Sequence, residues 1–177
     1  MRILILLISL CISSIATAQN TTDLNNFFNQ ISTERHYKIK RIEEKKIEID
    51  TFELIFLDKE HIKKYISDDD IEYFRKQIMT PGDTLWQKSE LKDFKLLNKK
   101  TIKRISHRTM KRMRIFPKSN FYYSFSAPIF SLSGEYALIE ERFHCGLMCA
   151  EFSLSIYRKD PYTKEWKKFI AVFSASS

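Results

Sequence analysis

The chain has 177 residues, of which 44% are hydrophobic, and its 30 Lys and Arg against 22 Asp and Glu give a formal net charge of +8. This composition is that of an ordinary globular protein. With only 3 Gly, 4 Pro and 3 Cys, it excludes collagen-like, low-complexity and disulfide-dense chains. The three glycines are isolated from one another, which also excludes the glycine-rich loops of dinucleotide-binding and P-loop nucleotide sites.

The first segment of the chain has the organisation of a signal peptide. A basic residue near Met1 precedes an apolar run over residues 3–12, and small residues follow, with Ala16 and Ala18 where a signal peptidase recognises them. The run is shorter than the ~20 residues of a membrane-spanning helix, and no later segment approaches that length. We therefore predict a signal peptide over residues 1–18, cleavage after Ala18, and a soluble periplasmic or extracellular chain without a transmembrane segment.

Residues 19–177 are expected to form a single domain, because no internal repeat and no long linker divides them. At its beginning, the apolar residues Leu24, Phe27 and Ile31 fall on one helical face. This spacing predicts an amphipathic helix over residues 23–35 that packs on the core.

The next part of the chain contains both strand and helix signals. Charged and apolar residues alternate over residues 38–57, through Leu54 and Phe56, and this alternation predicts one or two strands. Ser67, followed three residues later by the acid Asp70, is typical of a helix N-cap. We expect that helix over residues 71–79.

The positive excess of the chain lies in one segment, because residues 94–134 carry ten basic and no acidic side chains. Two structures fit it: a basic amphipathic helix over residues 98–116, or a short strand at residues 94–97 followed by a second near Ile102 and a polar loop. Such a run of charge is either a solvated face or a binding surface for an anion. The candidate anion-binding residues, here called the basic segment, are Lys99, Lys100, Lys103, Arg104, Arg108, Lys111, Arg112 and Arg114.

From Asn120 onward the chain changes to short apolar stretches separated by turn residues, which predicts an antiparallel meander. The stretches lie at residues 121–125, 128–132, 136–144, 152–158 and 166–173. We therefore expect an α+β fold in which N-terminal helices pack on a C-terminal antiparallel β-meander.

Cys145 and Cys149 are the two cysteines that remain after the predicted cleavage. In an exported protein we expect a disulfide bond between them, with Gly146 providing the freedom that a tight closure needs. Thiol exchange is a weaker interpretation, because the two cysteines are not spaced as Cys-x-x-Cys. A zinc site with His144 is also weaker, because His144 and Cys145 are adjacent in a predicted strand and point to opposite faces.

The sequence contains no recognisable active-site motif, and we predict no catalytic residue, metal ligand or cofactor. Glu140 and Glu141 are neighbours in a predicted strand, so they point to opposite faces and do not form an acid/base pair. We expect a non-enzymatic binding or envelope-associated module. Two alternatives stay open: an electrostatic binder of anionic glycan, lipopolysaccharide or nucleic acid through residues 95–118, and an enzyme of unrecognised type. In the electrostatic case the partner is an anionic polymer or an envelope surface.

Several stretches of the second half occur together in a recognisable order. They are Ser126–Ser131, Tyr136–Ile139, Cys145–Cys149 and Trp166–Lys168, preceded by Asp70–Tyr73. In this order they resemble a family of exported Bacteroidetes proteins with S-x-P-I-F-S, C-G-x-x-C and W-K motifs, from which the chain departs at Ala150, a glycine in the family pattern. The resemblance implies export and an antiparallel C-terminal region. It implies no activity, because none is established for that family.

Overall fold

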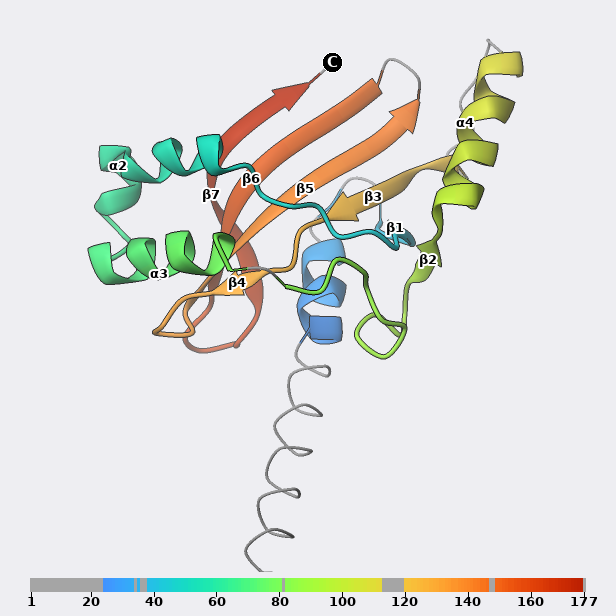
Figure 1. Ribbon diagram of the computed structural model, residues 1–177. Helices are drawn as coiled ribbons and strands as arrows, with labels where there is room; N and C mark the ends of the chain where they lie inside the picture. Colours follow the sequence, from blue (N-terminus) through green and yellow to red (C-terminus); the bar gives the residue numbers. More distant parts are fainter. Residues whose placement is uncertain are drawn as a thin grey trace, which may run out of the picture.

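The protein is built around a seven-stranded sheet with the strand order β2-β1-β3-β5-β6-β7, in which β4 pairs with β5 outside this order. The computed structural model describes residues 24–33, 35, 38–80, 82–112, 120–146 and 149–176. Helices lie on both faces of the sheet and at one of its edges (Figure 1).

The C-terminal part of the sheet is an antiparallel meander, as the sequence predicts. Its long strands are β5 (Tyr136–Gly146), β6 (Cys149–Lys159) and β7 (Trp166–Ser176), and β3 (Tyr122–Phe125) pairs with the other edge of β5. Successive side chains of a strand point to opposite faces, so each long strand contributes to two separate cores.

Three short strands complete the sheet and make it mixed. β1 (Arg41–Glu43) runs parallel to β3, β2 (Lys95–Leu97) runs parallel to β1, and β4 (Ile129–Phe130) runs antiparallel to β5. The fold is therefore broadly α+β, as expected, but its sheet is not the purely antiparallel meander of the prediction. Parallel neighbours are joined by long crossover connections, which local turn residues do not reveal.

One face of the sheet, here called the N-helix face, is covered by a helix over residues 24–33. Phe27 and Ile31 of this helix are fully buried. Phe27 meets Tyr157 of β6 edge to face, with the ring centroids 5.7 Å apart. The predicted N-terminal amphipathic helix and its packing on the core are thus confirmed.

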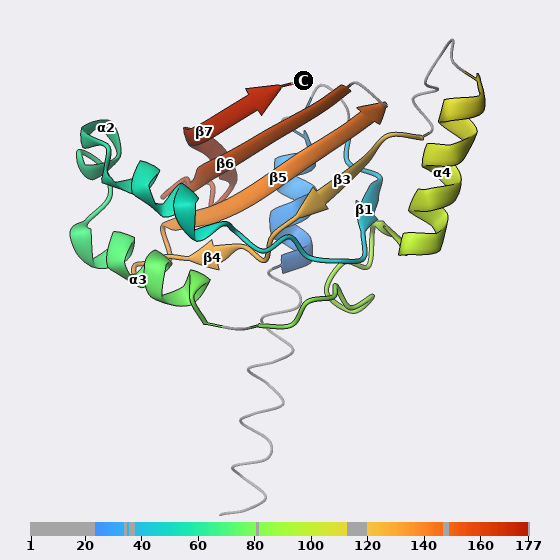
Figure 2. The same ribbon diagram turned by 45° about the horizontal axis from the view of Figure 1, so that its top comes forward.

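The opposite face, here called the α3 face, is covered by η1 (Thr51–Asp58), α2 (Glu60–Lys63) and α3 (Asp68–Ile78) (Figure 2). Ile71 and Phe74 of α3 are buried there against the apolar residues of β5 and β6. Few helices of the described chain precede the meander: those named here divide between its two faces, and α4 (Lys99–Arg112) lies at an edge.

The N-cap predicted for α3 is confirmed. Ser67 Oγ accepts a hydrogen bond from the backbone N–H of Asp70 at 3.1 Å. Three acids in the first turn suit the positive end of the helix dipole. Asp70 also accepts a hydrogen bond from the backbone N–H of Leu132 at 2.8 Å, which ties the start of the helix to the turn after β4.

The strand prediction for residues 38–57 is wrong in its second half, where η1 is a 3-10 helix. Asp50 caps it by accepting a hydrogen bond from the backbone N–H of Phe52 at 2.9 Å. The buried residues of η1 are Leu54 and Leu57, which are three apart and share one face of a 3-10 helix, whereas Phe52 is exposed. A short apolar run does not distinguish the two-residue period of a strand from the three-residue period of a 3-10 helix.

In its described part, up to Arg112, the basic segment adopts the helical alternative. α4 (Lys99–Arg112) follows β2 directly, so the short strand of the other alternative is present as well. Asn98 caps the helix, since its Oδ1 accepts a hydrogen bond from the backbone N–H of Thr101 at 2.9 Å. Figures 1 and 2 show α4 at the edge of the sheet beside β2, on the opposite side of the molecule from α2 and α3.

The predicted signal peptide, residues 1–18, lies outside the described residues, so export stays a prediction. Among the helices of the described part of the chain, none has the length and apolarity needed to cross a membrane.

Candidate functional site

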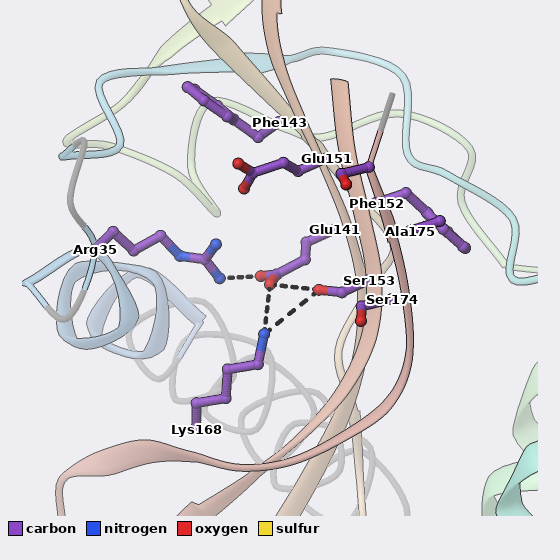
Figure 3. A pocket seen from close by; sticks show the side chains of 10 residues that line it. Arg35, Glu141, Phe143, Glu151, Phe152, Ser153, Lys168, Ser174 and Ala175 are labelled. Carbon is purple, nitrogen blue, oxygen red and sulfur yellow. Dashed lines mark hydrogen bonds and ion pairs between the residues drawn. The ribbon is translucent and has the colours of Figure 1, made fainter. Parts of the chain in front are cut away.

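A cavity of about 320 Å³ opens on the N-helix face of the sheet. It lies over β5, β6 and β7, next to the point where the chain leaves the N-terminal helix (Figure 3). The side chains around it include Arg35, Glu141, Phe143, Glu151, Ser153 and Lys168.

Several elements bring the charged residues of this cavity together. Arg35 follows the N-terminal helix, whose apolar side is fixed against the sheet. Glu141 of β5 stands opposite Ser153 of β6 in the antiparallel pairing. Lys168 of β7 stands opposite Tyr157 of β6, and Tyr157 lies four residues along β6 from Ser153, on the same face.

The carboxylate of Glu141 accepts hydrogen bonds from four side chains. Its Oε1 accepts from Ser153 Oγ at 2.8 Å and from Lys168 Nζ at 3.2 Å. Its Oε2 accepts from Arg35 Nη2 and from the Tyr157 hydroxyl, the latter at 3.4 Å. Arg35 Nη2 also donates to the Tyr157 hydroxyl at 2.7 Å. Both oxygens of Glu141 are therefore fully engaged.

These contacts keep Glu141 ionised although its side chain is only 6% exposed. Burial acts to raise the pKa of Glu141, but the charges of Arg35 and Lys168 outweigh it and hold the pKa below the ordinary value. Burial also acts to lower the pKa of Arg35, and the neighbouring Glu141 reverses this effect. The cavity is thus bordered by a carboxylate and two cations that are bonded to one another.

The cluster around Glu141 was not among the candidates from the sequence. Arg35 and Glu141 are 106 positions apart, and Glu141 and Lys168 are 27 apart. One signal was present: Glu141 falls in the same strand phase as the apolar residues Ala137, Ile139 and Phe143. An acid on the apolar side of a strand indicates a buried partner of opposite charge.

On the α3 face, Glu140 is fully buried and binds Arg142, whose Nε and Nη2 donate to Oε1 at 2.9 and 2.7 Å. The other oxygen of Glu140 and one oxygen of Glu53 are buried and have no hydrogen-bond partner among the described residues. Burial, and then the charge of Glu140, raise the pKa of Glu53 to about 7. The two glutamates of β5 lie on opposite faces, as predicted.

A serine, a histidine and a glutamate also meet on the α3 face. Ser124 Oγ donates to Glu43 Oε2 at 2.6 Å and lies 3.0 Å from His144 Nε2. Because the hydroxyl has one proton and gives it to the carboxylate, His144 acts as the donor toward Ser124. The histidine therefore does not take the proton of the serine, as the base of a catalytic triad does.

A disulfide bond joins Cys145 and Cys149 at the end of the β5–β6 hairpin, which confirms the prediction. The bond leaves neither sulfur as a thiolate, the form that binds zinc or exchanges disulfides. Within the described residues, no three His, Cys, Asp or Glu side chains are placed to hold a metal ion.

The structure places four members of the basic segment on the surface of α4. Lys99, Lys100, Lys103 and Arg104 are exposed, while Ile102 is half-buried. None of the four forms an ion pair with a described residue. The backbone of Arg108, Lys111 and Arg112 continues the helix, whereas their side chains, and all of Arg114, lie outside the described residues.

We compared the chain with family models, curated proteins and solved structures, and found no match in any of the three comparisons.

Proposed function

We propose that this protein is an exported, non-enzymatic binding module that attaches to an anionic glycan of the cell envelope, lipopolysaccharide included, through α4. The observation that carries this proposal is the surface charge of the described part of the helix. Its four described basic side chains are exposed and form no ion pair with a described residue. The sequence places no acid between residues 94 and 134.

The position of these charges supports a role outside folding. Lys99 and Lys100 occupy the first turn of α4, which contains no acid. Positive charge is unfavourable there, because the N-terminal end of a helix dipole is itself positive. The two lysines therefore do not stabilise their own helix, whereas an external anion would be attracted to them.

The state of the polar clusters favours binding over catalysis. Glu141 is saturated by four donors, and Ser124 gives its proton to Glu43. Cys145 and Cys149 are bonded to each other. In none of these clusters is a nucleophile paired with a free base, which is the arrangement that nucleophilic catalysis uses.

The test measures how binding depends on salt. The chain without its predicted signal peptide is titrated with lipopolysaccharide and, separately, with duplex DNA between 50 and 500 mM NaCl, values on the order of those that separate electrostatic from other binding. We expect glycan binding that weakens steeply with salt. The test variant replaces the four described basic residues of α4 with Gln and is expected to bind at least about tenfold more weakly at low salt.

A matched variant removes the same charge elsewhere. It replaces four exposed lysines outside α4 with Gln, namely Lys64, Lys76, Lys92 and Lys164. If both variants lose affinity equally, binding reflects net charge and the assignment to α4 is wrong. If the protein bound DNA more tightly than lipopolysaccharide, with the same dependence on α4, the proposed ligand would be wrong and nucleic acid would replace the glycan.

A further inference from the structure

A second cavity, here called the β2 cavity, lies between β2 and the loop that leads into this strand. Its volume is about 730 Å³, within the range of about 300 to 1,000 Å³ that is usual for small-molecule sites. Glu44, Trp86, Phe94 and Lys95 are among the residues that line it. Figure 1 shows the loop at one end of β2 and α4 at the other. Because β2 has three residues, only about 10 Å of strand separates the cavity from the first turn of α4.

Two aromatic rings form the floor of the β2 cavity. Trp86 and Phe94 line it although they are only 2% and 3% exposed, so they lie at its base, while exposed residues form its rim. Both rings meet Phe28 of the N-terminal helix edge to face, with centroids 5.3 and 6.2 Å apart. The electron-rich face of an aromatic ring attracts C–H groups such as those of a sugar ring. The floor is therefore fixed by the core and suited to a sugar.

The loop that closes the β2 cavity is held in place from two sides. Lys88 Nζ donates hydrogen bonds to three backbone carbonyls of this loop, at 2.6 to 3.3 Å. Asp93 accepts hydrogen bonds from the side-chain amides of Asn25 and Asn29 in the N-terminal helix, at 2.7 and 2.6 Å. The cavity is thus formed before a ligand binds, which reduces the ordering cost of binding.

Glu44 and Lys95 bring opposite charges to the β2 cavity, and neither forms an ion pair with a described residue. Lys95 is exposed and stands directly opposite Arg41 of β1, so two cations are neighbours there. Like charges in such a pair repel each other, and an external anion relieves this repulsion. Glu44 is half-buried, and its carboxylate can only accept hydrogen bonds, as from the hydroxyl groups of a sugar.

We propose that the β2 cavity binds a single acidic sugar unit, whose phosphate or carboxylate contacts Lys95, whose hydroxyl groups donate to Glu44, and whose ring packs on Trp86 and Phe94. The inference rests on the proposed function, because it takes the ligand of α4 to be an anionic glycan. α4 then binds the charges of neighbouring units, and the cavity determines which sugar is recognised. Lysines outnumber acids among the residues that line the cavity, which disfavours a cationic sugar.

The test titrates the chain without its predicted signal peptide with single sugars in place of the polymer. Glucose 1-phosphate and glucuronate are the acidic probes, and glucose and inorganic phosphate are the controls. We expect at least one acidic sugar to raise the unfolding temperature, because a ligand of the folded state stabilises it. Each control lacks one of the two kinds of contact and should bind at least about tenfold more weakly.

NMR locates the bound sugar. The chain has two tryptophans, of which Trp86 lines the β2 cavity. The indole signal of Trp86 should shift when the acidic sugar is added. The indole signal of Trp166, assigned by its loss in Trp166→Phe, should stay in place.

Variants of the two charged residues separate the site from general charge effects. Lys95→Gln should weaken binding of the acidic sugar about tenfold, whereas Lys76→Gln, at an exposed position of α3, should leave it unchanged. Glu44→Gln tests the sugar contact by the sign of its effect. Removal of a negative charge strengthens the binding of a bare anion, whereas loss of an acceptor for hydroxyl groups weakens the binding of a sugar. We expect the affinity for the acidic sugar to fall at least about threefold and that for inorganic phosphate not to fall.

The α4 variant described above separates this inference from the proposed function. It should lose affinity for lipopolysaccharide but keep its affinity for the acidic sugar within about twofold, because salt screens exposed charges about 10 Å away. If lipopolysaccharide binds through α4 but no acidic sugar binds at 10 mM, roughly the weakest affinity worth assigning to a site, the inference about the cavity alone is wrong. It is also wrong if inorganic phosphate binds as tightly as the acidic sugar, or if Lys95→Gln and Lys76→Gln lose affinity equally. If acidic sugars bind in the cavity and lipopolysaccharide does not bind, the proposed function is wrong and the cavity is still a sugar site.

Discussion

Glu140 and Glu141 are neighbours in β5 and both are buried, yet their hydrogen bonds and their pKa shifts differ, because they lie on opposite faces of the sheet. On the N-helix face, Glu141 accepts hydrogen bonds at both oxygens, and its pKa lies below the ordinary value. On the α3 face, Glu140 binds Arg142 through one oxygen, and burial raises its pKa. Its other oxygen has no partner among the described residues, and neither has one oxygen of Glu53.

The comparison shows that burial alone does not decide the charge of a carboxyl group. Both side chains lose water, which favours the neutral form. Arg35 and Lys168 outweigh that effect for Glu141, whereas among the described residues Glu140 pairs with one cation, Arg142, which is itself 47% exposed. The surroundings of Glu141 on the N-helix face therefore favour its ionised form, whereas burial on the α3 face shifts Glu140 and Glu53 toward the neutral form.

The largest effect is expected when the charge of Glu141 is removed. Glu141→Gln leaves Arg35 and Lys168 beside a neutral amide. Removing one partner of a buried ion pair strongly destabilises a protein, because the other partner stays buried without a compensating charge. We expect the free energy of unfolding to fall by about 3 kcal/mol at pH 7, measured by urea denaturation.

The matched variant is the neighbouring Glu140→Gln. Because burial already disfavours the charge of Glu140, neutralising it costs less than neutralising Glu141, and we expect a change of less than about 1 kcal/mol. Equal losses in the two variants would show that the faces do not differ and would contradict the comparison.

The next effect concerns the disulfide, which closes the end of the β5–β6 hairpin on the N-helix face. Replacing Cys145 and Cys149 with Ala should lower the free energy of unfolding by about 2 kcal/mol, because a closed loop of five residues restricts the unfolded chain only slightly. Urea denaturation measures the loss. Mass spectrometry of the unreduced wild-type protein should show two hydrogens fewer than the reduced form, and rapid labelling of both thiols would contradict this.

The pH dependence of stability should separate the two faces by its sign. The folded-state pKa of Glu53 is about 7 against an ordinary 4.5, so Glu53 makes the protein less stable as pH rises from 4.5 to 7. Glu141, whose pKa is lowered, makes the protein less stable as pH falls through its folded-state pKa.

Glu53→Gln isolates the first of these contributions. We expect this variant to be about 1 kcal/mol more stable than wild type at pH 8 and nearly equal at pH 5, a modest difference because Glu53 is partly exposed. Thermal unfolding across this pH range is the measurement, and Glu48→Gln, at an exposed position, is the control. If the stability difference between Glu53→Gln and wild type were the same at all pH values, the pKa of Glu53 would not be raised in the folded protein.

The elements predicted correctly have local causes. Ser67 and the acids after it mark the start of α3, and the spacing of Phe27 and Ile31 marks the N-terminal helix. The start of α4 also has a local cause, because Asn98 is an N-cap residue of the same standing as Ser or Asp.

The errors and omissions have long-range causes. The apolar residues of η1 were assigned to a strand, and only the packing of η1 on β7 and α3 shows that Leu54 and Leu57 are the buried ones, while Phe52 and Ile55 are exposed. The register of β7 shifts against β6 at two points, and this register decides that Lys168 lies near Glu141. A pairing shift of one residue would turn Lys168 to the other face, so the cavity cannot be assembled from the sequence alone.

The smallest effect is expected from Arg142, the cation of the α3 face. Arg142→Gln removes both donors of Glu140, yet Glu140 can respond by taking up a proton, since burial has already raised its pKa. We expect a loss below about 1 kcal/mol at pH 6 that grows as pH rises, measured by urea denaturation at several pH values. Arg35→Gln, the equivalent change on the N-helix face, should cost more at every pH above the folded-state pKa of Glu141, because Glu141 stays ionised there and loses one of its two cationic partners among the described residues. A larger loss for Arg142→Gln than for Arg35→Gln would mean that Glu140 keeps its charge when its partner is removed, and that the two faces hold their carboxyl groups in the same state.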